Sequence, residues 1–144
     1  MTRFALLLIL AVPAYADYRK SVADTNYDGT YTITSGEKDG EKIPEDRIKG
    51  TKVRIEGSKI TTVDKDSKEV YVATFSAQDG KANTILIKST VPKEYSATGM
   101  IEKSKDEIKL IYALPEGPAP TQFKTTKGQQ MFVLKLAKSE KQDK

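Results

Sequence analysis

The stretch "YDGTYTITS", residues 27–35, decides the fold because its side chains alternate along the chain. In an extended conformation, successive side chains point to opposite faces, so the odd-numbered residues share one face. That face carries Tyr27, Gly29, Tyr31, Ile33 and Ser35, and the other carries one aspartate and three threonines. A period of two over nine residues predicts a β-strand, and we expect the face with Tyr31 to point into the protein.

The same stretch overlaps the first half of a calcium-binding loop. Asp24, Asn26 and Asp28 occupy alternate positions and are followed by Gly29, as in an EF-hand. The bidentate glutamate required at the twelfth position is missing, because that position is Ser35, and no helical pattern flanks the segment. We therefore favour the strand and expect no metal site.

The alternation continues in short segments rich in Val, Ile, Thr and Tyr, separated by polar turn residues. It predicts eight strands: Tyr27–Ser35, Lys52–Glu56, Lys59–Asp64, Glu69–Ala77, Asn83–Ser89, Ala97–Lys103, Glu107–Leu114 and Gln130–Leu136. Short turns such as "EGSK", residues 56–59, predict sequential hairpins. The stretch "IPEDRIKG", Ile43–Gly50, predicts one short helical turn, because Pro44 suits its start and Gly50 its end.

Eight sequential antiparallel strands leave two open edges unless they close on themselves, and closure removes the unpaired edge groups. The predicted fold class is therefore all-β, a single eight-stranded antiparallel up-and-down barrel over residues 27–136. Residues 17–26 form a linker, and residues 137–144 form a charged C-terminal tail. Two long connections, 35–50 and 114–129, break the series of hairpins. The interior of such a barrel either is filled by side chains or holds one small ligand.

The first sixteen residues, "MTRFALLLILAVPAYA", have the pattern of a signal peptide. Arg3 precedes an apolar run from Phe4 to Val12, which is too short to cross a bilayer as a helix, and a small-x-small site ends at Ala16. We expect cleavage after Ala16, a secreted or periplasmic protein, and no transmembrane segment after removal of this signal.

Composition disfavours most catalytic mechanisms. The chain has no His and no Cys, so the usual general base near neutral pH and the thiolate nucleophile are absent. The 24 Lys and Arg are dispersed among 20 Asp and Glu and form no basic run interleaved with aromatic residues. We expect a non-enzymatic protein with no cofactor and no nucleic-acid partner.

The stretch "YDGTYTITSGEKDGEKIPEDRIKG", residues 27–50, resembles the opening of a family of small secreted lipocalin-like domains found in planctomycetes. "PTQF", residues 120–123, and "FVLKL", residues 132–136, extend the resemblance over nearly all of the predicted domain. It implies a lipocalin-like or calycin-like barrel in which Tyr31 closes one end and packs against a basic residue of the last strand, here Lys135. This chain has Tyr31 where the family has tryptophan. The family has no settled activity.

Four aromatic side chains on the predicted inward faces are the candidate lining of a ligand pocket: Tyr31, Phe75, Tyr112 and Phe132. Inward aromatic residues are also the ordinary content of a packed core. The leading hypothesis is a barrel that binds a small apolar or amphipathic ligand. The alternative is a packed barrel that binds or inhibits a cell-envelope or extracellular protein through its surface or the proline-rich connection 114–129.

Overall fold

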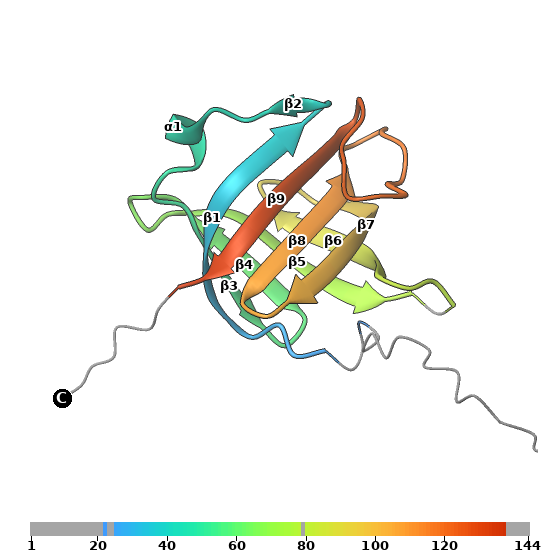
Figure 1. Ribbon diagram of the computed structural model, residues 1–144, viewed down its shortest axis with the longest axis horizontal. Coiled ribbons are helices and arrows are strands. Elements are labelled where there is room, and N and C mark those ends of the chain that lie inside the picture. Colours follow the sequence, from blue (N-terminus) through green and yellow to red (C-terminus); the bar gives the residue numbers. More distant parts are fainter. Residues whose placement is uncertain (1–21, 23–24, 79, 138–144) are drawn as a thin grey trace, which may run out of the picture.

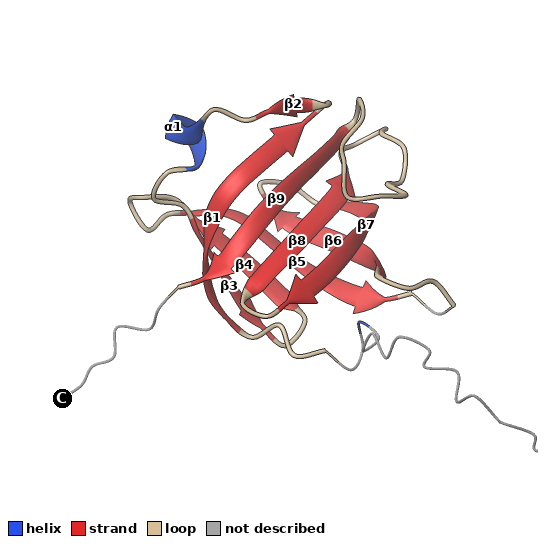
Figure 2. Ribbon diagram, in the orientation of Figure 1, coloured by secondary structure: helices blue, strands red, loops and turns tan. Residues whose placement is uncertain are grey.

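The computed structural model describes residues 22, 25–78 and 80–137, which form strands almost throughout (Figures 1 and 2). The strands are β1 (Gly29–Lys38), β2 (Glu41–Lys42), β3 (Lys52–Glu56), β4 (Lys59–Val63), β5 (Glu69–Ala77), β6 (Thr84–Val91), β7 (Tyr95–Ser104), β8 (Glu107–Ala113) and β9 (Gln129–Leu136). The helix among these residues, α1 (Glu45–Ile48), is a single turn within the predicted segment 43–50.

The strands close into an antiparallel barrel. β1 and β3 to β9 pair in sequence order, and β9 pairs back with β1, so eight strands form a closed ring. β2 lies outside this ring and pairs with β1 alone among the described strands. The prediction of an all-β, eight-stranded antiparallel barrel with one short helical turn is confirmed.

β1 joins the two ends of the sheet because it pairs with β3 along its first residues and with β9 along most of its length. A bulge between Ile33 and Ser35 shifts its register against β9. After the bulge, Gly36 pairs with Phe132 and is buried, whereas Ser35 pairs with Val133. The expectation that Ser35 points inward with Tyr31 is therefore wrong, since the extra residue of a bulge reverses the alternation beyond it.

β1 also runs three residues further than predicted. Glu37 and Lys38 pair with β2 across a tight turn at Asp39 and Gly40, whose φ angles are 55° and 84°. Two successive positive φ angles are those of a type I′ turn, which the Asp-Gly dipeptide favours. The predicted connection 35–50 thus begins with a hairpin.

The two ends of the barrel differ. At one end lie the turns after β3, β5 and β7 and the start of β1, which carries Tyr31, whose side chain is fully buried. The Tyr31 hydroxyl donates a 2.7 Å hydrogen bond to the carbonyl oxygen of Tyr27. The Tyr27 ring meets that of Phe75 edge-on, with centroids 5.8 Å apart. Aromatic side chains therefore pack together inside this end, which we call the closed end, although a shallower surface pocket lined by Tyr27, Gly57 and Phe75 lies outside them.

The other end carries α1, β2 and the long loop of residues 114–128 (Figure 1). We call it the open end. The predicted signal peptide 1–16, most of the linker 17–26 and residues 138–144 of the predicted tail lie outside the described residues.

Candidate ligand-binding pocket

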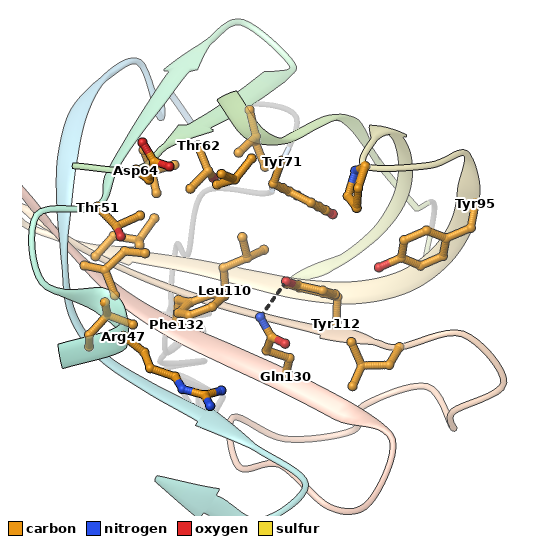
Figure 3. Close-up of a pocket in the computed structure, with 18 of the residues that line it drawn as sticks. Arg47, Thr51, Thr62, Asp64, Tyr71, Tyr95, Leu110, Tyr112, Gln130 and Phe132 are labelled. Carbon is orange, nitrogen blue, oxygen red and sulfur yellow. Dashed lines mark hydrogen bonds between the residues drawn. The ribbon is translucent and has the colours of Figure 1, made fainter. Parts of the chain in front are cut away.

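A pocket of about 550 Å³ occupies the open end of the barrel (Figure 3). This volume falls within the range of about 300–1,000 Å³ typical of small-molecule sites. The lining residues come from every strand of the barrel except β6, together with α1 and the loops: Ile33, Arg47, Ile48, Thr51, Val53, Ile60, Thr62, Asp64, Val70, Tyr71, Pro92, Lys93, Tyr95, Leu110, Tyr112, Leu114, Pro115, Gln130, Phe132 and Leu134.

The segment 43–51 forms one wall of the pocket. β1 leaves β3 after Thr32, and the chain between β2 and β3 fills the space at the open end. The Ile43 N–H donates a 2.9 Å hydrogen bond to the carbonyl of Gly36, which fixes this segment against β1. α1 then places Ile48, which is buried, in the pocket wall and Arg47, which is exposed, at its rim.

The deeper part of the pocket is apolar. Val53, Ile60, Leu110 and Leu134 are all at least 95% buried and belong to the same core as the closed end. Ile33 and Phe132 pack against that core while remaining partly accessible. The alternation of each strand directs these side chains inward, so a ligand in the deeper part would contact hydrocarbon on all sides.

The mouth is polar on the side formed by β5, β7, β8 and β9. The rings of Tyr71 and Tyr112 stack with centroids 5.9 Å apart and an interplanar angle of 15°. The Gln130 side-chain amide donates a 3.1 Å hydrogen bond to the Tyr112 hydroxyl, which accepts it (Figure 3). We call Tyr71, Tyr95 and Tyr112 the tyrosine cluster, since their hydroxyl groups point toward the same part of the pocket in Figure 3.

The Tyr71 hydroxyl oxygen is buried and makes no hydrogen bond within the described part of the chain. Burial, and secondarily the neighbouring Tyr95 hydroxyl, raise the pKa of Tyr71 far above its usual value. The Tyr71 hydroxyl interacts with the Tyr95 hydroxyl, which raises the pKa of Tyr71 and, against the larger effect of burial, lowers that of Tyr95, but the pair does not meet the distance and angle of a regular hydrogen bond. Burial also raises the pKa values of Tyr95 and Tyr112, so all three phenols are neutral hydroxyl groups near neutral pH.

The long loop 114–128 is fixed to the first hairpin. Glu37 accepts two 2.7 Å hydrogen bonds from Thr125, one from its backbone N–H and one from its hydroxyl. The Thr125 hydroxyl in turn accepts a 2.9 Å hydrogen bond from the Gly40 N–H, and Asp39 accepts one of 2.7 Å from the Gly128 N–H. These bonds hold the second end of the loop, and a 2.8 Å hydrogen bond from the Leu114 N–H to the Gly128 carbonyl connects the pocket residues Leu114 and Pro115 to it.

Three charged side chains lie at the rim. Arg47 and Lys93 are exposed, and neither forms an ion pair with a carboxylate of the described residues. The Asp64 carboxylate accepts hydrogen bonds of 2.9 and 3.0 Å from the backbone N–H groups of Asp66 and Lys68. Asp64 thus closes the turn between β4 and β5, and the two cations are the charged groups free to meet a ligand.

The four aromatic residues expected to line a pocket separate into two pairs. Tyr112 and Phe132 line the pocket at the open end. Tyr31 and Phe75 face inward but lie in the closed end, away from it. Lys135, which the resemblance would pair with Tyr31, is exposed, and its neighbour Leu134 is the buried residue on β9.

The sequence interpretation missed Tyr71 and Tyr95. Tyr71 occupies the same face of β5 as Ala73 and Phe75, which are buried as expected for that face. Its place in the pocket follows from this alternation combined with its position near the start of the strand. Tyr95 begins β7 two residues before the predicted start, so no strand pattern could assign it a face.

Asn26 and Asp28 of the calcium-like stretch serve local backbone contacts. The Asn26 side chain accepts a 2.9 Å hydrogen bond from the Asp28 N–H, and the Asp28 carboxylate accepts one of 2.8 Å from the Gly57 N–H. Ser35 lies within β1, and Asp24 lies outside the described residues. The part of the chain that the structure describes contains no group of three His, Cys, Asp or Glu placed to hold a metal ion.

The described helix is far shorter and more polar than a membrane-spanning helix. Comparison with protein-family models, curated proteins and solved structures finds no match to this chain. The resemblance to the planctomycete lipocalin-like family therefore stays a prediction.

Proposed function

We propose that this protein is a non-enzymatic barrel that binds a small amphipathic ligand in the pocket at its open end. The observation that carries the proposal is a pocket of about 550 Å³ with an apolar interior and hydroxyl groups at its mouth. Burial of apolar ligand surface supplies affinity, at about 25 cal/mol per Å² removed from water. A few polar groups at one level then fix the orientation of the ligand.

The test is binding of the uncharged fluorescent dye N-phenyl-1-naphthylamine to the purified protein. Thr62→Trp places a large ring in the pocket, because Thr62 lines it from β4. Thr61→Trp is the matched control, since Thr61 is the preceding residue of the same strand and does not line the pocket. We expect the first variant to lose about tenfold or more in dye affinity, roughly 1.4 kcal/mol, and the control to bind as the wild type does.

Native mass spectrometry after incubation with a lipid extract identifies the natural ligand class. A retained small molecule that Thr62→Trp excludes and Thr61→Trp retains supports the proposal. Dye binding that neither variant changes, with nothing retained from the extract, contradicts it. Circular dichroism of both variants establishes that the barrel is intact.

The alternative is a packed barrel that binds or inhibits a cell-envelope or extracellular protein. Its premise is a filled interior, and the pocket argues against that premise. Replacing the proline-rich connection 114–129 with Gly and Ser separates the two hypotheses in a pull-down from envelope extracts. Capture of a partner that depends on this connection, together with no bound small molecule, would favour the interaction module.

We further propose that the protein acts outside the cytoplasm, as a secreted or periplasmic protein. The support is the signal-like pattern of residues 1–16, with its apolar run and the site ending at Ala16. Expression in an exporting bacterial host and intact-mass measurement of the extracytoplasmic fraction test it. A mature chain beginning at Asp17 is expected, and an intact Met1 terminus retained in the cytoplasm contradicts it.

A further inference from the structure

Two hydroxyl groups in the pocket have hydrogen atoms that no described acceptor receives in a regular hydrogen bond. The Tyr71 hydroxyl is buried and makes no regular hydrogen bond, although it interacts with the neighbouring Tyr95 hydroxyl. The Tyr112 hydroxyl accepts from Gln130, and none of the described hydrogen bonds uses its own hydrogen. A buried polar group without a partner destabilises the folded state, and phenylalanine at position 71 would avoid that cost. The presence of an unpaired hydroxyl at the mouth of a pocket is explained if an atom of the ligand accepts its hydrogen bond.

Three strands bring these groups together. Tyr71 lies near the start of β5, Tyr95 begins β7, and Tyr112 lies near the end of β8. Because neighbouring strands are antiparallel, all three positions are at the open end, above the apolar part of the pocket. Figure 3 shows their hydroxyl groups converging on one side of the mouth.

We propose that the tyrosine cluster recognises a neutral carbonyl oxygen of the ligand, with the Tyr71 hydroxyl as the principal donor. This inference rests on the proposed function and adds the chemical class of the ligand: an apolar body that fills the deeper pocket and a ketone or ester group at the level of the tyrosines. A carbonyl oxygen is a pure acceptor with two lone pairs, so it matches a site that offers hydroxyl hydrogens.

A carboxylate fits this level less well. A buried anion requires a paired cation, and the two cations of the pocket, Arg47 and Lys93, are exposed at its rim. The phenols themselves carry no charge near neutral pH, because their ordinary pKa of 10.0 lies well above it and burial raises the pKa further. A neutral ligand oxygen accepts hydrogen bonds from these hydroxyl groups without the free-energy cost of removing a charge from water.

The test compares benzophenone with diphenylmethane, which differ only in a carbonyl group in place of a methylene. Binding of each is measured by isothermal titration calorimetry and by displacement of the fluorescent dye. We expect the wild type to prefer benzophenone by about fivefold or more, the worth of one hydrogen bond. Tyr71→Phe should abolish this preference while leaving the affinity for diphenylmethane within about twofold.

Tyr31→Phe is the matched control. It removes the same hydroxyl from the closed end, where Tyr31 is bonded to the Tyr27 carbonyl and does not line the pocket. We expect it to keep the preference for benzophenone. Because the readout is a ratio of two affinities in the same variant, a general loss of stability does not change it.

The outcomes separate the two proposals. If neither compound nor the dye binds, the proposed function fails. If both compounds bind equally well and Tyr71→Phe changes nothing, the barrel still binds apolar molecules but the carbonyl inference is overturned. Tighter binding of diphenylacetate than of benzophenone, dependent on Tyr71, also overturns it in favour of an anionic ligand group.

Discussion

Gly117 and Gly128 pack backbone against backbone where the long loop closes on itself. A Cβ atom on Gly117 would overlap the carbonyl oxygen of Gly128 and lie 2.8 Å from its carbonyl carbon. The same carbonyl oxygen accepts a 2.8 Å hydrogen bond from the Leu114 N–H. The close approach of the two glycines thus fixes the first residues of the loop, including the pocket residues Leu114 and Pro115.

Gly117→Ala should therefore destabilise the protein and weaken ligand binding together. The added methyl group meets backbone atoms, which cannot rotate away as a flexible side chain would. We expect a loss of about 1–3 kcal/mol in the free energy of unfolding, as for other overpacked sites. Urea titration measures the stability, and dye titration measures the accompanying loss of affinity.

Gly57→Ala is the control for this substitution. Gly57 has a φ of 61° and open space where a Cβ would be, in the turn between β3 and β4 at the closed end. We expect a conformational cost of about 1–2 kcal/mol and unchanged dye affinity. Equal dye affinity in both alanine variants would show that the contact between Gly117 and Gly128 does not shape the pocket.

The alternation of side chains predicted the closed barrel but not every strand end. Its failures have local causes in β1. The bulge after Ile33 inserts one residue, so Gly36 takes the inward position that the pattern gave to Ser35. The hairpin at Asp39 and Gly40 has a sequence signal, since Asp-Gly favours a type I′ turn, but the flanking Glu and Lys residues carry no apolar alternation to mark strands.

Alternation also indicates which side chains face inward without indicating how deep they lie. Tyr31, Phe75 and Tyr112 all face inward, as expected, yet Tyr112 alone of these three reaches the pocket. Depth follows from strand direction: β1 starts and β5 ends at the closed end, whereas β8 ends at the open end. Strand direction reverses at each turn, so counting the turns from Tyr31 along the chain would have placed Phe75 at the same end of the barrel and Tyr112 at the opposite end. Tyr95 and Arg47 required the coordinates, because neither lies in a predicted strand.

Removal of a hydroxyl should have opposite effects on stability at the two ends of the barrel. Tyr31→Phe removes a hydrogen bond and leaves the Tyr27 carbonyl without this donor, which we expect to cost about 1 kcal/mol or more. Tyr71→Phe removes a hydroxyl that makes no regular hydrogen bond, so the free energy of unfolding should stay the same or rise. Urea titration of the ligand-free proteins tests both expectations. An equal loss in both variants would mean that Tyr71 has a hydrogen bond in solution.

The hydrogen bonds between Glu37 and Thr125 should make the loop attachment sensitive to acid. Those bonds lower the pKa of Glu37 below its ordinary value of 4.5, with a smaller contribution from Lys124. A lowered folded-state pKa stabilises the fold above the unfolded-state value, and this contribution is lost as the pH falls through the folded-state pKa. The stability advantage of wild type over Glu37→Gln should thus be constant above about pH 5 and shrink toward zero below about pH 4.

Urea titrations of both proteins across this acid range test the expectation. Glu41→Gln on the neighbouring β2 is the control, because its exposed side chain is not among those that bind the long loop. We expect Glu41→Gln to have the same free energy of unfolding as the wild type at every pH. If the free energies of unfolding of Glu37→Gln and the wild type differ by a constant amount down to the lowest pH, the assigned role of the Glu37 charge is contradicted.

The tyrosine cluster should make the fold sensitive to alkali. Burial raises the pKa values of Tyr71, Tyr95 and Tyr112 above the ordinary value of 10.0. A group whose pKa is raised by folding contributes fully to stability below its unfolded-state pKa, and that contribution falls as the pH rises toward the folded-state value. The free energy of unfolding should therefore be constant up to about pH 10 and fall above it. The fall should be smaller in Tyr71→Phe than in the wild type, because that variant has one buried phenol fewer.

Absorbance at 295 nm measures tyrosinate formation, and circular dichroism measures whether the barrel remains folded. Ionisation of all the tyrosines near pH 10 with the barrel intact would mean that the cluster is open to water.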